Sequence, residues 1–407
     1  MAVLPYGYDS SVQWELADGV PPAEIGTPHG QPLADLEAAT TAALAEPIDY
    51  PALARCITPA DHVVLTLDHG LPQAAQVTAA IIGDLVAAGL DPDGITVLRS
   101  PADLGVGASD PCRLVPSPLR QRITRLVHDP ADRRQLAYLA ASESGEAILI
   151  HRALHEADVV LPVGCLRAEE LAGYFGIHSP IFPTFSDAKT IQRFRSAGLL
   201  NGRGRRREMV AEVDHVAWLL GVNFTIQVVP AAGNHVLHVL SGQSESVRSR
   251  GRELYREAWS WPAPGRASLV VAGIAGDAGQ QTWENVGRAL QVADGFVEAD
   301  GAIAVCCELA TKPGPALRRM ANAQWRESAI RRVERHPAVD AVPAAQLAHA
   351  LNRHKVYLLS RLDPSVVEDL DVIPLAGADE LQRLARQHAS CLLVSNAQYV
   401  APVAAEQ

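Results

Sequence analysis

Short apolar runs rich in β-branched residues alternate with amphipathic helical patterns along most of this 407-residue chain. Strands that alternate with helices in this way are typical of parallel sheets covered by helices. The sequence therefore predicts an α/β fold with mostly parallel sheets. The expected strands are His62–Leu67, Ile95–Leu98, Ala147–Ile150, Asp158–Val163, Phe224–Val229, His235–Leu240, Ser268–Ala272, Ala302–Cys306, Lys355–Leu359 and Cys391–Val394. The expected helices are Thr78–Ala88, Arg134–Ala141, Val247–Ala258, Thr282–Ala293 and Ala344–Leu351.

One pair of expected strands departs from this alternation. Phe224–Val229 and His235–Leu240 are joined by the short turn PAAGN, which predicts an antiparallel hairpin. The Pro- and Gly-rich stretch WSWPAPGRA (Trp259–Ala267) follows before the next strand. We therefore expect an N-terminal α/β domain at 1–262 and a Rossmann-like second domain at 263–407, with a ligand cleft between them.

Composition narrows the class of protein. The hydrophobic content of 48% and charged content of 20% are those of an ordinary globular protein. A net charge of −11 argues against a nucleic-acid partner. The sequence has neither a long uninterrupted apolar run nor a secretory signal, so we expect no membrane span and a cytoplasmic location. The six cysteines form no CxxC pair and are expected to be reduced.

Two segments stand out as candidate sites. Ala157–Pro183 runs from an apolar strand into a loop that contains Gly173 and Gly176, and Val63–Pro72 runs from an apolar strand to Asp68. Polar residues at the carboxyl ends of such strands often face the ligand crevice of an α/β sheet. The alternative for Asp68 is a cap on the following helix.

These segments resemble motifs of the lactate racemase family. The family loop PHxxAGFSGGxK aligns on Ala172-Gly173, and the segment around Asp68 resembles the family's DxTRPxP motif. The order of such motifs along nearly the whole chain is similar to their order in the family. The resemblance implies two α/β domains and 2-hydroxy-acid racemisation or epimerisation by hydride transfer on a nickel-pincer nucleotide. It also implies that Asp68, Gly173 and Gly176 help to bind the nucleotide.

The residues at the family's chemical positions differ from the pattern. The catalytic His falls on Glu169, the cofactor-bearing Lys on Ser179, the nickel-ligand His on Arg195 and the substrate Arg on Leu71. A serine hydroxyl cannot form the thioamide-type link that a lysine amine provides, and a protonated arginine cannot ligate a metal. Ser179 and Arg195 therefore argue against the nickel-pincer nucleotide, and no metal ligand is assigned.

Glu169 and His178 remain the candidate catalytic residues. Glutamate can act as a base where burial raises its pKa, and His178 lies directly before Ser179. Two functions are compatible with these features. The first is a homologue, degenerate at the nickel-pincer site, that binds a small anionic molecule without racemising it. The alternative is a divergent 2-hydroxy-acid racemase or epimerase, and a different reaction with Glu169 or Glu170 as base is also open.

Overall fold

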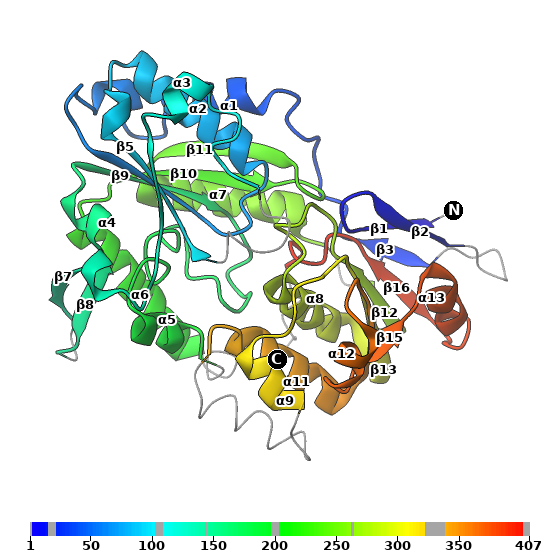
Figure 1. The fold of residues 1–407 in the computed structure, drawn as a ribbon. Coiled ribbons are helices and arrows are strands. Elements are labelled where there is room, and N and C mark those ends of the chain that lie inside the picture. The colour runs from blue at the N-terminus through cyan, green and yellow to red at the C-terminus, as the bar shows by residue number, and fades with distance from the viewer. Residues whose placement is uncertain are drawn as a thin grey trace.

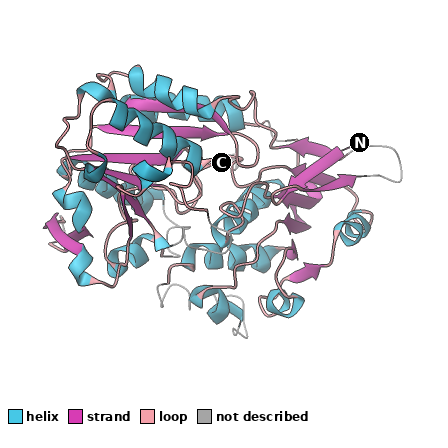
Figure 2. Cartoon of the chain, turned by 45° about the horizontal axis from the view of Figure 1, so that its top comes forward, coloured by secondary structure: helices cyan, strands magenta, loops and turns pink. Residues whose placement is uncertain are grey.

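The structure of the chain is a computed structural model that describes residues 2–14, 22–101, 109–142, 145–196, 203–261, 264–321 and 338–401. Two six-stranded sheets lie side by side, each with helices packed against it (Figures 1 and 2). The predicted α/β class with mostly parallel sheets is confirmed. No helix among the described residues is both long enough and apolar enough to cross a membrane.

The first sheet, called the N-terminal sheet, has the order β11-β10-β9-β4-β5-β6. Its strands are β4 (Val63–Leu67), β5 (Ile95–Arg99), β6 (Thr124–Val127), β9 (Val159–Cys165), β10 (Phe224–Pro230) and β11 (Val236–Gln243). All neighbours are parallel except β10 and β11, which form the predicted hairpin.

The second sheet, called the C-terminal sheet, has the order β15-β14-β13-β12-β16-β3, and all its neighbours are parallel. Its strands are β12 (Ala267–Gly273), β13 (Val297–Cys306), β14 (Lys355–Leu359), β15 (Ile373–Leu375), β16 (Cys391–Val394) and β3 (Ala23–Ile25). The hairpin β1 (Ala2–Tyr6) and β2 (Ser10–Trp14) packs against this sheet as well (Figure 1). The first three strands of the chain therefore contact the sheet that contains its last strand, β16.

The helices follow the strands as the alternation predicts. In the first half they are α1 (Leu36–Ala45), α2 (Ala74–Ala87), α3 (Ser117–Arg120), α4 (Arg152–Glu156), α5 (Ala188–Phe194), α6 (Arg203–Leu219) and α7 (Ser244–Trp259). In the second half they are α8 (Trp283–Phe296), α9 (Pro315–Ala321), α11 (Ala341–Arg353), α12 (Pro364–Glu368) and α13 (Ala378–Ala385).

Alternate residues of the central strands face different helices. In β4, Val63 and Leu65 share a core with α2, whereas Val64 shares one with α6. In β12, Val270 packs with α8 and α11, whereas Val271 packs with the β1–β2 hairpin and α13. Both faces of each sheet are thus covered, which explains why these strands are continuous apolar runs in the sequence.

One predicted helix is wrong. Arg134–Ala141 contains β7 (Leu136–Ala141), which pairs antiparallel with β8 (Ala147–His151) in a separate two-stranded sheet. The alanine-rich sequence has high helix propensity, but propensity is a weak preference that tertiary pairing overrides.

Candidate functional site

Each sheet has a point at which its connections change direction. In the N-terminal sheet, β5 and β6 lie on one side of β4, whereas β9 and β10 lie on the other. In the C-terminal sheet, β13 and β14 lie on one side of β12, whereas β16 lies on the other. Loops that leave neighbouring strands in opposite directions open a crevice at the strands' carboxyl ends, where α/β proteins commonly bind ligands.

Residues that follow β4 and β9 line the crevice of the N-terminal sheet. Asp68 directly follows β4, and one of its carboxylate oxygens accepts a 3.4 Å hydrogen bond from Cys165 N at the end of β9. Arg167 lies two residues beyond β9 and is only 5% exposed. Burial raises the pKa of Asp68, and the nearby Arg167 guanidinium opposes that shift.

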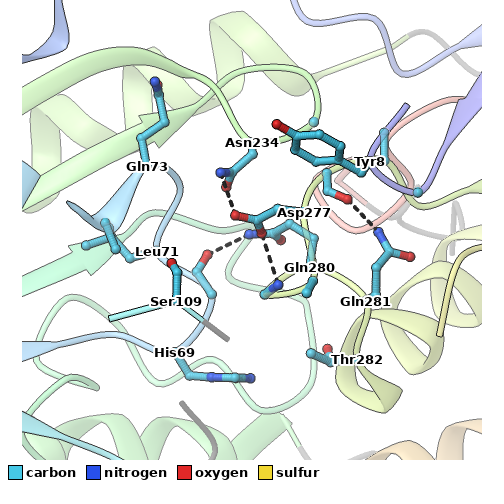
Figure 3. Close-up of a pocket in the computed structure, with 18 of the residues that line it drawn as sticks. Tyr8, His69, Leu71, Gln73, Ser109, Asn234, Asp277, Gln280, Gln281 and Thr282 are labelled. Carbon is cyan, nitrogen blue, oxygen red and sulfur yellow. Dashed lines mark hydrogen bonds between the residues drawn. The ribbon is translucent and has the colours of Figure 1, made fainter. Parts of the chain in front are cut away.

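The loop between β12 and α8 closes the crevice from the opposite side. Gln280 Nε2 donates to Gly70 O at 2.8 Å and so joins this loop to the residues after β4 (Figure 3). Gln281 Nε2 donates to Gly276 O at 3.0 Å, and its carbonyl accepts from Glu308 N at 2.8 Å. The loop is therefore held in one conformation by its own side chains.

The turn between β10 and β11 crosses from the N-terminal sheet to the C-terminal sheet. Asn234 Nδ2 donates to Asp277 at 2.8 Å (Figure 3), and Gly233 N donates to Asn396 Oδ1 at 2.7 Å. Burial raises the pKa of Asp277, and the N–H groups of Gly279 and Gln280 oppose that shift. The predicted PAAGN hairpin thus connects the two crevices, a role that its sequence does not reveal.

A cavity of about 910 Å³ lies between the two crevices. Its wall includes Asp68, His69 and Gly70 after β4, the Gly276–Thr282 loop, and Tyr8 from the β1–β2 turn (Figure 3). A cavity of this size is sufficient for a small organic ligand. The predicted cleft between two α/β units is therefore present.

Two arginines, Arg167 and Arg288, lie behind the cavity wall, close enough to Asp68 to lower its pKa. Arg167 Nη1 is buried without a hydrogen-bond partner among the described residues, and its guanidinium lies 6.0 Å from the ring centre of Tyr399. Arg288, in the second turn of α8, donates to Asn285 Oδ1 at 2.7 Å, and its Nε has no partner in the described part of the chain. Burial, followed by repulsion from Arg167, lowers the pKa of Arg288 to about 10. Both groups are charged at neutral pH.

The residues predicted from sequence lie in different places. Asp68 lines the cavity, whereas Glu169, His178, Gly173 and Gly176 are absent from its wall. Glu169 is half-exposed and is hydrogen-bonded to Arg252 at 2.5 Å. The two glycines have positive φ angles and no atom close to the position of a Cβ, so they shape the loop.

His178 is buried beside Asp214. Its Nδ1 lies 2.8 Å from Asp214 Oδ1, and Arg248 donates two further hydrogen bonds to the same carboxylate. This carboxylate–imidazole pair fixes the ring orientation. The other ring nitrogen of His178, Nε2, has no hydrogen-bond partner among the described residues. The candidate catalytic residues Glu169 and His178 therefore lie outside the cavity wall that contains Asp68.

The positions that the family resemblance assigns to the cofactor do not fit it. Ser179 Oγ donates to Gly176 O at 2.7 Å and accepts from Phe175 N at 3.2 Å, so the hydroxyl is part of the loop's own turn. Arg195 donates to Val339 O at 3.2 Å and lies 3.9 Å from Glu284. No group of three or more His, Cys, Asp or Glu in the described ranges could hold a metal ion.

Sequence reasoning missed the residues that join the two sheets. Arg167, Asn234, Gln280 and Tyr399 are far apart in the chain and belong to no shared motif. One signal was available for Arg167, because it is a charged residue that directly follows an apolar strand and lies within the segment already selected. Arg288 belongs to none of the motifs identified in the sequence.

Comparisons with known proteins agree with this fold. Residues 6–206 match the family described as the lactate racemase N-terminal domain. The lactate racemase apoprotein from Thermoanaerobacterium thermosaccharolyticum has a similar structure, with a TM-score of 0.79 over 99% of each chain at 17% identity. A protein from Thermotoga maritima matches with a TM-score of 0.66 at 12% identity, over 91% of this chain and 99% of its own. No curated protein sequence matches the chain. Residues 6–206 are therefore similar in sequence to the lactate racemase N-terminal domain, and the whole chain has a fold similar to that of the lactate racemase apoprotein.

Proposed function

We propose that this protein binds a small anionic molecule between its two sheets and does not racemise it by nickel-pincer chemistry. The main support is the pairing of the two crevices around a cavity, with the buried Arg167 beside its Asp68 and Gly70 and one guanidinium nitrogen left without a hydrogen-bond partner among the described residues. Asp68 and Glu284 are the carboxylates next to Arg167 and Arg288, but none of the described carboxylates forms a hydrogen bond with Arg167 Nη1. An anionic ligand would accept the hydrogen bond that Arg167 Nη1 does not make within the described residues, and leaving such a buried donor unpaired is costly.

The chemistry of the cofactor positions supports the second half of the proposal. A covalent link to the pincer nucleotide requires an amine, and Ser179 offers a hydroxyl that already makes two hydrogen bonds. Nickel ligation requires a neutral imidazole, and Arg195 offers a protonated guanidinium. No step of the family reaction is therefore assigned to this chain.

The alternative is a divergent 2-hydroxy-acid racemase or epimerase, which the retained cavity and Asp68 favour. In that case the candidate catalytic residues Glu169 and His178 would have to reach the ligand from outside the cavity wall. Glu169 is held by Arg252 and His178 by Asp214, so both are engaged by neighbours. This arrangement favours binding over turnover.

The proposal can be tested by combining ligand binding with an activity assay. Small carboxylates and inorganic phosphate are added to the purified chain at constant ionic strength, and lactamide serves as the neutral control. Because a ligand of the folded state stabilises it by mass action, at least one anion should raise the melting temperature and lactamide should not. Single enantiomers of lactate and related 2-hydroxy acids should keep their configuration on chiral chromatography. Racemisation, or the absence of stabilisation by every anion, would contradict the proposal.

A further inference from the structure

Arg167 lies where the two crevices meet. It follows β9, next to Asp68 in the N-terminal sheet, and its guanidinium lies over the ring of Tyr399, which follows β16 in the C-terminal sheet. Tyr399 is fixed in turn, because its ring contacts Trp259 at 5.3 Å between centres and its carbonyl accepts a hydrogen bond from Tyr255. The guanidinium is therefore held in place by aromatic residues from both halves.

One nitrogen of this guanidinium has no hydrogen-bond acceptor in the described part of the chain. Arg167 is 5% exposed, and its Nη1 has no acceptor among the described residues. Buried polar groups are nearly always hydrogen-bonded, and an unpaired one costs stability. An arginine presents its N–H groups as a planar fork that matches the two oxygens of a carboxylate or phosphate.

Gly70 is the residue of the cavity wall that lies next to this guanidinium. Gly70 lines the cavity, and a Cβ built on it would lie 3.6 Å from Arg167 Nη2. Because glycine has no side chain, that space adjoins both the cavity and the guanidinium. The φ of Gly70 is +71°, a conformation that disfavours other residues and keeps the space open.

We propose that Arg167, assisted by Arg288, binds the oxyanion group, a carboxylate or a phosphate, of the small molecule held in the cavity. The proposal rests on the proposed function and specifies which residues recognise the charge. Leu71 occupies the position at which the family resemblance places an arginine, and it is 6% exposed. Leu71 carries no positive charge after β4, and Arg167, which follows the neighbouring strand β9, would thus supply that charge instead.

The test compares Arg167→Leu, Arg167→Lys and Arg122→Leu by calorimetric titration with acetate, lactate and inorganic phosphate. Arg122 is a surface arginine that is paired with Asp91 and Asp93 and is not part of the cavity wall, and it serves as the matched control. Losing a charged hydrogen bond should weaken binding by roughly 10- to 100-fold in Arg167→Leu. Arg167→Lys keeps the charge without the fork, so it should bind several-fold more weakly than wild type. Arg122→Leu should bind like wild type.

The possible outcomes separate the two proposals. Weaker binding in the folded Arg167 variants supports the inference, and the anion that binds wild type best identifies the oxyanion as carboxylate or phosphate. Wild-type affinity in either folded Arg167 variant overturns the inference and leaves the proposed function standing. Failure of wild type to bind any of the anions overturns both. Circular dichroism and the melting temperature without ligand show which variants are folded, and Arg167→Lys remains informative if Arg167→Leu does not fold.

Discussion

Asp68 is the residue at which the sequence prediction and the structure agree most closely. Its place after an apolar strand predicted that it would face a ligand crevice, and it lines the cavity. The alternative role as a helix cap receives no support, because the residue before α2 is Gln73 and α2 has no side-chain cap. Its contribution to ligand binding remains a prediction.

Burial of Asp68 should make stability depend on pH. Because the pKa of Asp68 is raised in the folded state, the fold binds this proton more tightly than the unfolded chain does. Its contribution to stability is therefore complete below the ordinary carboxyl pKa and is lost as pH rises through the raised one. Asp68→Asn should unfold at higher urea than wild type at pH 7, and the difference should vanish as pH falls towards about 4.

Asp93→Asn serves as the control of opposite sign. A hydrogen bond from Arg122 lowers the pKa of Asp93, so its stabilising effect is present above the ordinary pKa and is lost as pH falls. A stability gap between Asp68→Asn and wild type that stayed constant or grew towards low pH would show that Asp68 is not destabilised by burial.

At the scale of elements, sequence periodicity located most strands and helices but not their partners. Strands such as β14 and β16 have the predicted bounds because flanking polar residues end short apolar runs. The pairing of β3 with β16 joins residues more than 350 positions apart, and nothing in the local sequence encodes it. The backbone segments after β3 and β16 approach closely at Gly26, since a Cβ on this residue would lie 1.9 Å from Ser395 O.

The pairing of β3 makes a specific prediction about the connection between α7 and β12. The proposed boundary between residues 262 and 263 lies in this connection, where Pro264, Gly265 and Arg266 are exposed. A protease of broad specificity should cut within 260–266, but the two fragments should elute together in gel filtration, because β3 remains paired with β16. Separation of the fragments, or no cleavage in this window, would contradict the expectation.

At the scale of the whole molecule, the two sheets meet through groups that no single motif contains. The bonds between Gln280 and Gly70, Asn234 and Asp277, and Gly233 and Asn396 all cross from one sheet to the other. The family resemblance predicted the cleft, whereas the charges around Arg167 and Arg288 became visible only once the chain was folded. Conversely, Glu169 and His178 were selected from one linear motif, and folding separates them from the cavity wall.

The most direct test of the account is the intact mass of the purified chain after co-expression with the enzymes that make the nickel-pincer nucleotide. A family member that has the cofactor-bearing lysine provides the positive control. Because Ser179 replaces that lysine, we predict the mass of the unmodified chain alone. A chain heavier by the mass of the covalently attached nucleotide would contradict it.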